Sequence, residues 1–159
     1  MGSRKNARLN RRILAGTLIL AVFTALAVLV PLLSPYSSTG MNPSIQNQGI
    51  SFAHLFGTDK FGRDIFVRVW SGAGISLMIG ASSMVVNGCI GILYGSAAGY
   101  AGGKTDFLLM RAADIISSIP SMLYVILISL VMGSGVLSII VGISVAGWID
   151  TARITGEKC

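Results

Sequence analysis

The residues best suited to specific chemistry gather in one short string, Gly57-Thr58-Asp59-Lys60-Phe61-Gly62-Arg63-Asp64, and in the four residues after it, which end at Arg68. Asp59 lies four residues before Arg63, and Asp64 lies four residues before Arg68. On a helix this spacing puts each acid on the N-terminal side of its base, which is the stabilising order. The pattern therefore predicts two ion pairs along one helix face.

The same stretch predicts an amphipathic helix at the membrane surface. Thr58 or Asp59 would cap its start by accepting backbone N–H bonds. Its apolar face would hold Phe61, Ile65 and Val69, with Phe66 beside them and Trp70 at headgroup depth. In one interpretation the ion pairs only solvate a connector. In the other they fix the entry angle of the span that follows, and composition leaves both open.

Other arrangements that could do chemistry are incomplete. His54 is the one histidine, and neither Cys89 nor Cys159 has a neighbour at metal-ligand or redox spacing. Gly102-Gly103-Lys104-Thr105 resembles the end of a phosphate-binding loop, but Ala98 occupies the position of its first glycine, after an apolar helix rather than a strand. No nucleophile with a base is apparent. We predict no enzymatic activity, no cofactor and no metal.

Composition points to a membrane protein. The chain has 159 residues, of which 53% are hydrophobic, and 12 basic plus 6 acidic residues make 18 charges. A soluble domain is roughly 25% charged, which would be about 40 residues. The net charge of +6 does not indicate nucleic-acid binding, because five basic residues fall in the first twelve positions, directly before an apolar run.

Charge-free stretches predict an all-α fold with about four transmembrane helices. The first is residues 13–33, whose 21 residues extend about 31 Å as a helix, close to the hydrocarbon thickness. An uncleaved anchor is favoured over a signal peptide, because the run is too long for one. The later helices are predicted near residues 75–100, 115–132 and 136–149, the last two joined by Gly133-Ser134-Gly135.

Basic residues predict the orientation. With residues 1–12 in the cytoplasm, inner segments hold nine Lys and Arg residues, and the outer segment 34–74 holds three. This asymmetry favours an inside N-terminus. Residues 75–159 would then form the transmembrane core, incomplete at its C-terminus.

Small and polar residues inside the spans predict helix packing. Gly91, Gly95 and Gly99 recur every fourth residue, a spacing that lets two helix backbones approach closely in lipid. Ser138, Gly142 and Ala146 repeat the device in the last span.

Two further residues in the spans have predicted roles. Asn87 is the most polar side chain near the middle of a span; a helix–helix hydrogen bond is favoured for it over lining a pathway. Pro120 removes a backbone donor and should kink the third span.

The order of these features resembles a known family, the C-type permease subunits of bacterial ATP-binding-cassette importers for oligopeptides, dipeptides and nickel, and the oligopeptide branch most closely. The likeness runs from about Arg4 to Glu157. The stretches that carry it are His54 to Asp64, Ala98-Gly99-Tyr100-Ala101-Gly102-Gly103, Met110-Arg111, Asp114-Ile115, Ser118-Ile119-Pro120, Gly133-Ser134-Gly135, Gly147-Trp148 and Ala152-Arg153.

The resemblance implies a multi-pass protein of the bacterial inner membrane that imports peptides. Its partners would be a second permease subunit, two cytoplasmic ATP-binding subunits that hydrolyse the ATP, and an external substrate-binding protein, with membrane lipid around it and no nucleic acid. Family members usually have six spans and a cytoplasmic coupling loop, the EAA motif, after the fourth.

Two departures from the family temper this expectation. The sequence stops at Thr155-Gly156-Glu157-Lys158-Cys159, where the coupling loop would begin, and Gly74 replaces a basic residue common in the family. We therefore expect a truncated permease. The alternatives are a small four-helix membrane protein with a structural or interaction role and a non-functional remnant.

Overall fold

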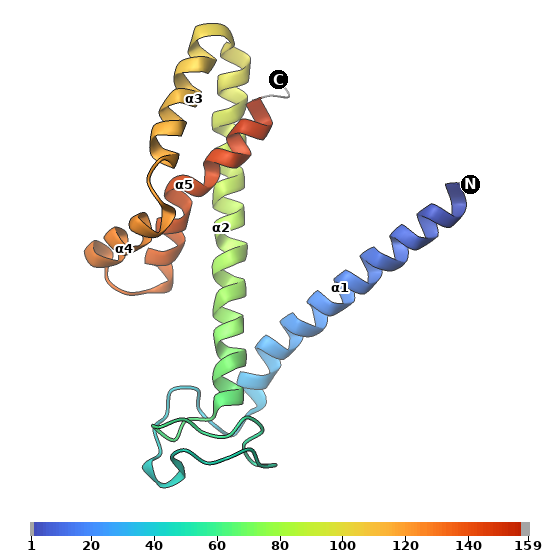
Figure 1. Cartoon of the computed structure of the whole chain (residues 1–159), viewed down its shortest axis with the longest axis vertical. Coiled ribbons are helices and arrows are strands. Elements are labelled where there is room, and N and C mark those ends of the chain that lie inside the picture. The colour runs from blue at the N-terminus through green and yellow to red at the C-terminus, as the bar shows by residue number, and fades with distance from the viewer. Residues whose placement is uncertain (1, 157–159) are drawn as a thin grey trace. The chain divides into compact units, whose positions relative to one another are not determined.

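A computed structural model describes residues 2–156, with side chains described from Asn10 onward. The described chain is helical apart from one loop segment (residues 34–64) and short connections, which confirms the all-α prediction (Figure 1). Its elements are α1 (Gly2–Leu33), the short 3-10 helix η1 (Pro43–Ile45), α2 (Ile65–Ala101), α3 (Gly103–Ser117), α4 (Ser121–Met132) and α5 (Val136–Gly156). The chain divides into two compact units, Met1–Leu77 and Met78–Cys159, each treated by itself below.

Three described helices are long and apolar enough to cross a membrane: Asn10–Leu33, Ile65–Ala101 and Val136–Gly156. Helices α3 and α4 pass the same test only as a pair bent by 72°. The four predicted spans are therefore reached if this bent pair counts as one. The bend lies at Pro120, where the sequence predicted a kink, because proline cannot donate the backbone bond that would continue the helix.

In the first unit, α1 packs closely against the start of α2. Ala27 is buried, and a Cβ placed on Gly74 would lie 3.2 Å from the Ala27 carbonyl oxygen. The rings of Phe23 and Trp70 lie beside this contact, with centroids 5.2 Å apart. A long basic side chain at position 74 would not fit into this contact. The close packing against Ala27 therefore explains the glycine at this position.

The predicted surface helix starting at Thr58 or Asp59 is wrong. Residues 57–64 form a tight turn, and the helix begins only at Ile65, from which it continues without a break to Ala101. The physical reason lies in two glycines, Gly57 and Gly62, which adopt φ values of 72° and 71°. This left-handed conformation is incompatible with a right-handed helix.

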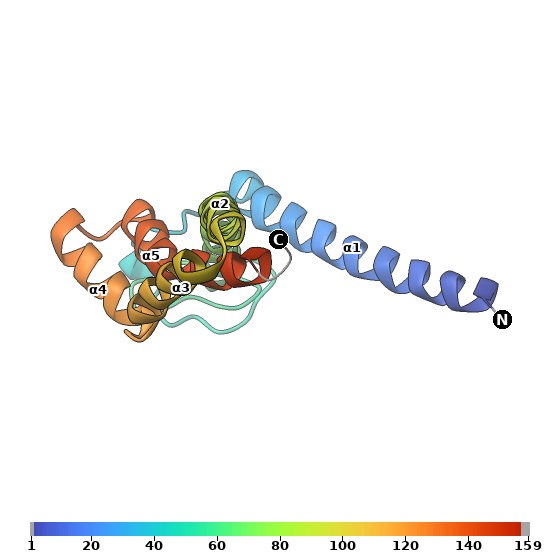
Figure 2. The same cartoon turned by 90° about the horizontal axis from the view of Figure 1, so that it is seen from above.

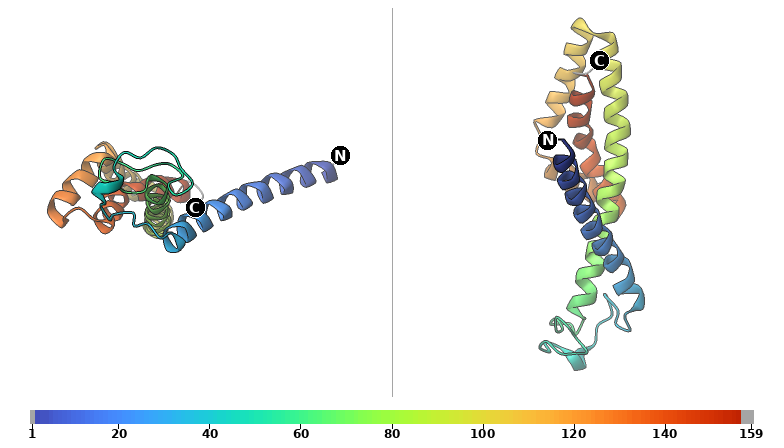
Figure 3. Two further views of the ribbon diagram at one scale, coloured as in Figure 1. Left: turned by 90° about the horizontal axis from the view of Figure 1, so that it is seen from below. Right: turned by 90° about the vertical axis from the view of Figure 1, so that its right-hand side faces the viewer.

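In the second unit, α2 and α3 form an antiparallel hairpin that turns at Gly102 and Gly103, both with positive φ. The Tyr94 hydroxyl on α2 donates to the Leu109 carbonyl on α3 at 2.8 Å. Helix α5 lies between these two helices, as the right-hand view of Figure 3 shows. Helix α4 packs on α5, on its side away from α2 (Figure 2).

The core of the second unit is where α5 meets this hairpin. Ile149 and Ala152 of α5 are almost completely buried, as is Ala113 of α3. The Trp148 ring packs on the Tyr94 ring with centroids 4.6 Å apart. Helix α5 runs to Gly156, past the bound of 149 predicted for the last span.

The close approach of α2 and α5 takes place at glycines. A Cβ on Gly91 would lie 2.6 Å from the Trp148 carbonyl oxygen, and one on Gly95 would overlap the Ala152 carbonyl oxygen. Gly99, the third member of the predicted row, is half-buried. In α5, a Cβ on Gly142 would lie 2.6 Å from the Val125 Cα of α4.

Because Gly91 faces backbone that cannot move away, Gly91→Leu should overpack the α2–α5 contact and lower the free energy of unfolding by about 1–3 kcal/mol. Gly88→Leu is the matched control, since nothing lies within 4 Å of a Cβ at Gly88. Thermal unfolding in detergent, followed by circular dichroism, measures both. Equal midpoints for the two variants would contradict the packing role.

Candidate functional site: the loop segment before α2

Residues 57–65 form a small hairpin that leads into α2. The Asp59 N–H donates to the Arg63 carbonyl at 3.0 Å, and the Gly62 N–H donates back to the Asp59 carbonyl at 2.9 Å. Below this turn, the Ile65 N–H donates to the Gly57 carbonyl at 3.1 Å. The string that was conspicuous in the sequence is therefore one local structure, a turn followed directly by a helix start.

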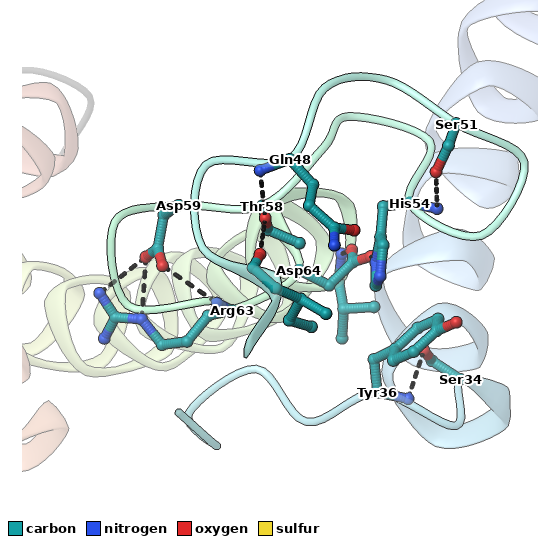
Figure 4. Close-up of polar contacts among 11 residues, drawn as sticks. Ser34, Tyr36, Gln48, Ser51, His54, Thr58, Asp59, Arg63 and Asp64 are labelled. Atoms are coloured by element: carbon teal, nitrogen blue, oxygen red, sulfur yellow. Dashed lines mark hydrogen bonds and ion pairs between the residues drawn. The ribbon is translucent and has the colours of Figure 1, made fainter. Parts of the chain in front are cut away.

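The Asp59 carboxylate organises the turn (Figure 4). Its Oδ1 accepts from the backbone N–H groups of Phe61 at 2.8 Å and Arg63 at 3.0 Å. Its Oδ2 accepts from Arg63 Nε at 2.9 Å and from Arg68 Nη1 at 2.6 Å. One acid thus binds two arginines and two backbone donors.

These contacts set the charge state of Asp59. Partial desolvation by itself would raise the pKa of this carboxyl. Several contacts outweigh desolvation and hold the pKa of Asp59 well below its usual range. They are the hydrogen bonds from the backbone and guanidinium of Arg63, the hydrogen bond from the Phe61 N–H, and the positive charge of Arg63.

Both glycines of the hairpin are required by close backbone contacts. A Cβ on Gly57 would overlap the Gln48 carbonyl oxygen, and one on Gly62 would overlap the Asn42 carbonyl oxygen. The hairpin is therefore wrapped by residues 42–48, whose backbone also bonds to it: the Asn42 N–H donates to the Phe61 carbonyl at 3.1 Å.

Thr58 joins the hairpin to that wrapping segment. Its buried hydroxyl accepts from the Gln48 N–H at 2.9 Å and donates to the Ile45 carbonyl. Its own N–H donates to the Gln48 carbonyl at 3.0 Å. The threonine is thus a structural crosslink, not a helix cap.

Asp64 is the residue that caps α2. Its Oδ1 accepts from the Val67 N–H at 2.9 Å, the third position of the helix. Its Oδ2 lies 2.8 Å from Nδ1 of His54. Both side chains are buried, and the ring of Tyr36 packs on the imidazole with centroids 4.6 Å apart. The loop is therefore attached to the helix start through one carboxylate.

The structure changes the predicted pairing. Asp59 and Arg63 pair as expected, with Arg63 Nη2 2.8 Å from the carboxylate, but across a turn rather than on a helix. Arg68 pairs with Asp59, not with Asp64. Trp70 lies on α2 with its indole Nε1 buried and without a hydrogen-bond partner in the described part of the chain.

Asn87 lies on α2 beside α5. A Cβ on Gly147 of α5 would lie 2.5 Å from its Nδ2, so the amide rests on the glycine backbone. Its Oδ1 is buried and has no hydrogen-bond partner among residues 2–156, so the expected helix–helix hydrogen bond is not formed there.

The pairing of His54 with Asp64 escaped the sequence reasoning. The two lie ten positions apart in the loop segment, and no periodicity relates them. A cue was present for the hairpin: two glycines five residues apart, around an aspartate, are typical of a turn rather than a helix. Among residues 2–156 no group of three or more His, Cys, Asp or Glu side chains could hold a metal ion.

Comparison with known proteins gives this hairpin a context. No protein-family model matches the chain. It is 42% identical over 145 residues to the dipeptide transport system permease protein DppC of Bacillus subtilis, covering 91% of this chain and 45% of that protein. It is 41% identical over 147 residues to the oligopeptide permease OppC of the same organism, covering 92% of this chain and 48% of that protein. It is 37% identical over 154 residues to OppC of Escherichia coli, covering 96% of this chain and 51% of that protein. This chain belongs to the family of peptide-transport permeases.

The chain spans about half the length of the curated relatives it matches. The dipeptide and oligopeptide relatives of Bacillus subtilis match at 42% and 41% identity, so the predicted preference for the oligopeptide branch stays a prediction. The hairpin of this permease chain offers no reacting group: its two acids are bound to arginines, backbone N–H groups and a histidine, which suits a rigid joint between loop and span.

Replacing Asp64 should destabilise the first unit. Asp64→Ala removes the cap of α2, which contributes about 1 kcal/mol, and leaves His54 buried without its partner, at a further 1–3 kcal/mol or so. Asp64→Asn keeps one acceptor oxygen and should lose less. Asp150→Ala is the control, because that carboxylate is 87% exposed. Denaturant unfolding in detergent ranks the three, and a loss for Asp64→Ala no larger than for Asp150→Ala would contradict the assignment.

The lowered pKa of Asp59 predicts a specific pH dependence. A carboxyl whose pKa is lower in the folded chain stabilises the fold above its ordinary value of 3.8, and this contribution is lost as the pH falls from there through the folded-state value. The turn should therefore keep its structure from neutral pH down to about pH 4. Carbon-13 NMR of labelled aspartates, with Asp59→Asn to assign the signal, measures the midpoint directly. A midpoint at or above 3.8 would refute the described contacts.

Proposed function

We propose that this chain is part of the membrane-spanning permease of an ATP-driven peptide importer. The observation that carries the proposal is its similarity, 41–42% identical over 145 and 147 residues, to permeases whose names state dipeptide and oligopeptide transport. The helices that are long and apolar enough to span support it.

The partners follow from this proposal. Transport would need a second permease subunit, two cytoplasmic ATP-binding subunits and an external substrate-binding protein, with ATP hydrolysed by the separate subunits. The chain would lie in the inner membrane of a bacterium with its N-terminus in the cytoplasm. Nine basic residues on one side against three on the other support this orientation, which puts the loop segment outside the cell.

The second unit offers a body that could move as one piece. Arg153 of α5 binds Asp114 of α3 through a 2.7 Å hydrogen bond, and its guanidinium also lies 3.3 Å from the Ser117 hydroxyl. Together with the glycine contacts between α2 and α5, these bonds join three helices. We propose that a force applied at the end of α5 moves this three-helix body rather than α5 alone.

The loop segment would fix the position of α2 at its N-terminal end. Because Asp64 caps α2 and binds His54, the position of α2 is tied to the fold of residues 34–64. We propose that the hairpin acts in positioning the span. We also propose that Asn87, a half-exposed residue whose buried carbonyl oxygen has no partner among the described residues, lies beside the transport pathway or a partner helix.

A chimera tests the function. The segment of Bacillus subtilis DppC that aligns with this chain is replaced by the corresponding 145 residues, and the chimera is expressed with the other subunits of that transporter in a strain lacking DppC. Dipeptide-dependent growth and uptake of a labelled dipeptide should return. The same chimera with Gly62→Val, which breaks the hairpin, is the negative control. A chimera that assembles with the other subunits at normal levels but takes up no dipeptide would contradict the proposal.

A further inference from the structure

The loop segment carries its large apolar side chains on the outside. Four of them fall within seven residues and form what we call the apolar loop cluster: Ile50, Phe52, Leu55 and Phe56. Ile50 is 83% exposed and Phe52 is fully exposed, while Leu55 and Phe56 are about half exposed. A connector facing only water would not be expected to gather such side chains in one place.

The interior of the same segment is polar. Thr58, His54 and Asp64 are among the most buried side chains of the first unit, each about 95% buried. The turn that carries the cluster is closed by its own bonds, with the Ser51 N–H donating to the His54 carbonyl and the His54 N–H to the Ser51 hydroxyl, both at 3.0 Å. A segment in an apolar environment needs apolar groups on its outside and hydrogen-bonded polar groups inside, and this segment has that arrangement.

The charges of the segment lie elsewhere. From residue 13 to residue 58 the chain has no Lys, Arg, Asp or Glu, and the charged side chains of the loop segment fall at 59–64. Figure 4 shows Asp59 and Arg63 on one side of the segment, and Ser51 and His54 on the other. Asp59 and Arg63 therefore mark a charged end of the segment, whereas the other acid, Asp64, is buried against His54 at the apolar end.

A cavity of about 450 Å³ connects the apolar end to α1. Val30 and Leu33 from the last turn of α1 line it together with Phe52 and Leu55 of the cluster, and the polar side chains of Ser34, Tyr36 and Asp64 also line it. Leu33 is 77% exposed, at the end of a helix that is long and apolar enough to span the membrane. The cavity is thus continuous with the face of α1 that meets lipid if α1 spans.

From these observations we infer that the apolar loop cluster is a lipid anchor: it dips into the membrane interface beside the end of α1, and a phospholipid acyl chain occupies the cavity. The charged end of the segment stays in water. This places the membrane contact at residues 50–56 of the loop, not on the surface helix that the sequence predicted. Whether the leaflet is the outer one rests on the proposed orientation, whereas the lipid contact itself does not.

Lipid fits this surface better than a protein partner does. Protein interfaces surround their apolar centre with a polar rim that hydrogen-bonds across. Here the cavity leads from the cluster onto the apolar end of α1. The one acid among its lining residues, Asp64, is buried and already bonded to His54 and to the Val67 N–H, so it offers no bond to a protein partner. Aromatic and aliphatic side chains at the end of a span are typical of residues that sit at the membrane interface.

Labelled cysteines in the 159-residue chain test the anchor. In a Cys89→Ser, Cys159→Ser background, Phe52→Cys and, separately, Ile50→Cys carry an environment-sensitive NBD fluorophore, and Lys60→Cys at the charged end is the matched control. The chain is reconstituted alone in phosphatidylcholine–phosphatidylglycerol vesicles. Labels at 50 and 52 should emit at shorter wavelength and be quenched several-fold more by lipids with a nitroxide near the headgroup than by aqueous iodide. The label at 60 should show the reverse.

Three results would overturn the anchor. Labels at 50 and 52 could be as open to iodide as the label at 60. They could become shielded only when an external binding protein or second permease is added, which would make the cluster a protein interface. Equal quenching by lipid at 52 and 60 would contradict the division into an apolar and a charged end. None of these readouts involves transport, so failure of the anchor and failure of the proposed function are distinguishable.

Discussion

The carboxylate of Asp64 makes two hydrogen bonds in different directions, and the order of the first unit depends on both. One bond caps α2 at Val67, and the other holds the buried imidazole of His54. A buried carboxylate is tolerable only when its oxygens are bonded, so the helix cannot start here unless the loop is folded around it. Since α2 runs unbroken from Ile65 to Ala101, the fold of the loop segment fixes where this long apolar helix begins.

The hairpin before Asp64 also depends on a carboxylate whose oxygens are all hydrogen-bonded, and here most of the partners lie within a few residues of the acid. Asp59 closes the turn by accepting from two backbone N–H groups and two arginines, while Gly62 lets the backbone of Asn42 come within contact distance. In the second unit glycines permit close contact in another way, because Gly91 and Gly95 bring two helix backbones together. The loop segment and the helix bundle therefore both have glycine, which carries no side chain, where two backbones come into contact.

Much of this fold could be predicted from the sequence, because hydrocarbon thickness and the spacing of charges constrain membrane helices strongly. The break at Pro120 and the turn at Gly133 follow from backbone chemistry in the same way. The start of α2 could not be predicted by spacing alone. The four-position spacing of Asp59 and Arg63 suits a helix turn and a hairpin equally, and only the positive φ of Gly62 decides between them. The bond between His54 and Asp64 joins loop residues that no periodicity relates.

The second unit still has a polar imbalance that its own helices do not resolve. Ser83, Asn87 and Ser144 each bury an oxygen that has no hydrogen-bond partner within the described residues. Ser83 and Asn87 lie one turn apart on α2, and Asn87 meets α5 at Gly147, one turn beyond Ser144. Inside a membrane each unbonded group is costly, and a solitary bundle would gain by replacing it with an apolar residue. Of the three residues only Asn87 is half-exposed, so a change of its side-chain rotamer would let pathway water or a helix of a partner subunit bond its amide. The imbalance therefore favours a chain that packs against a partner, as the proposed permease would, over a bundle that stands alone.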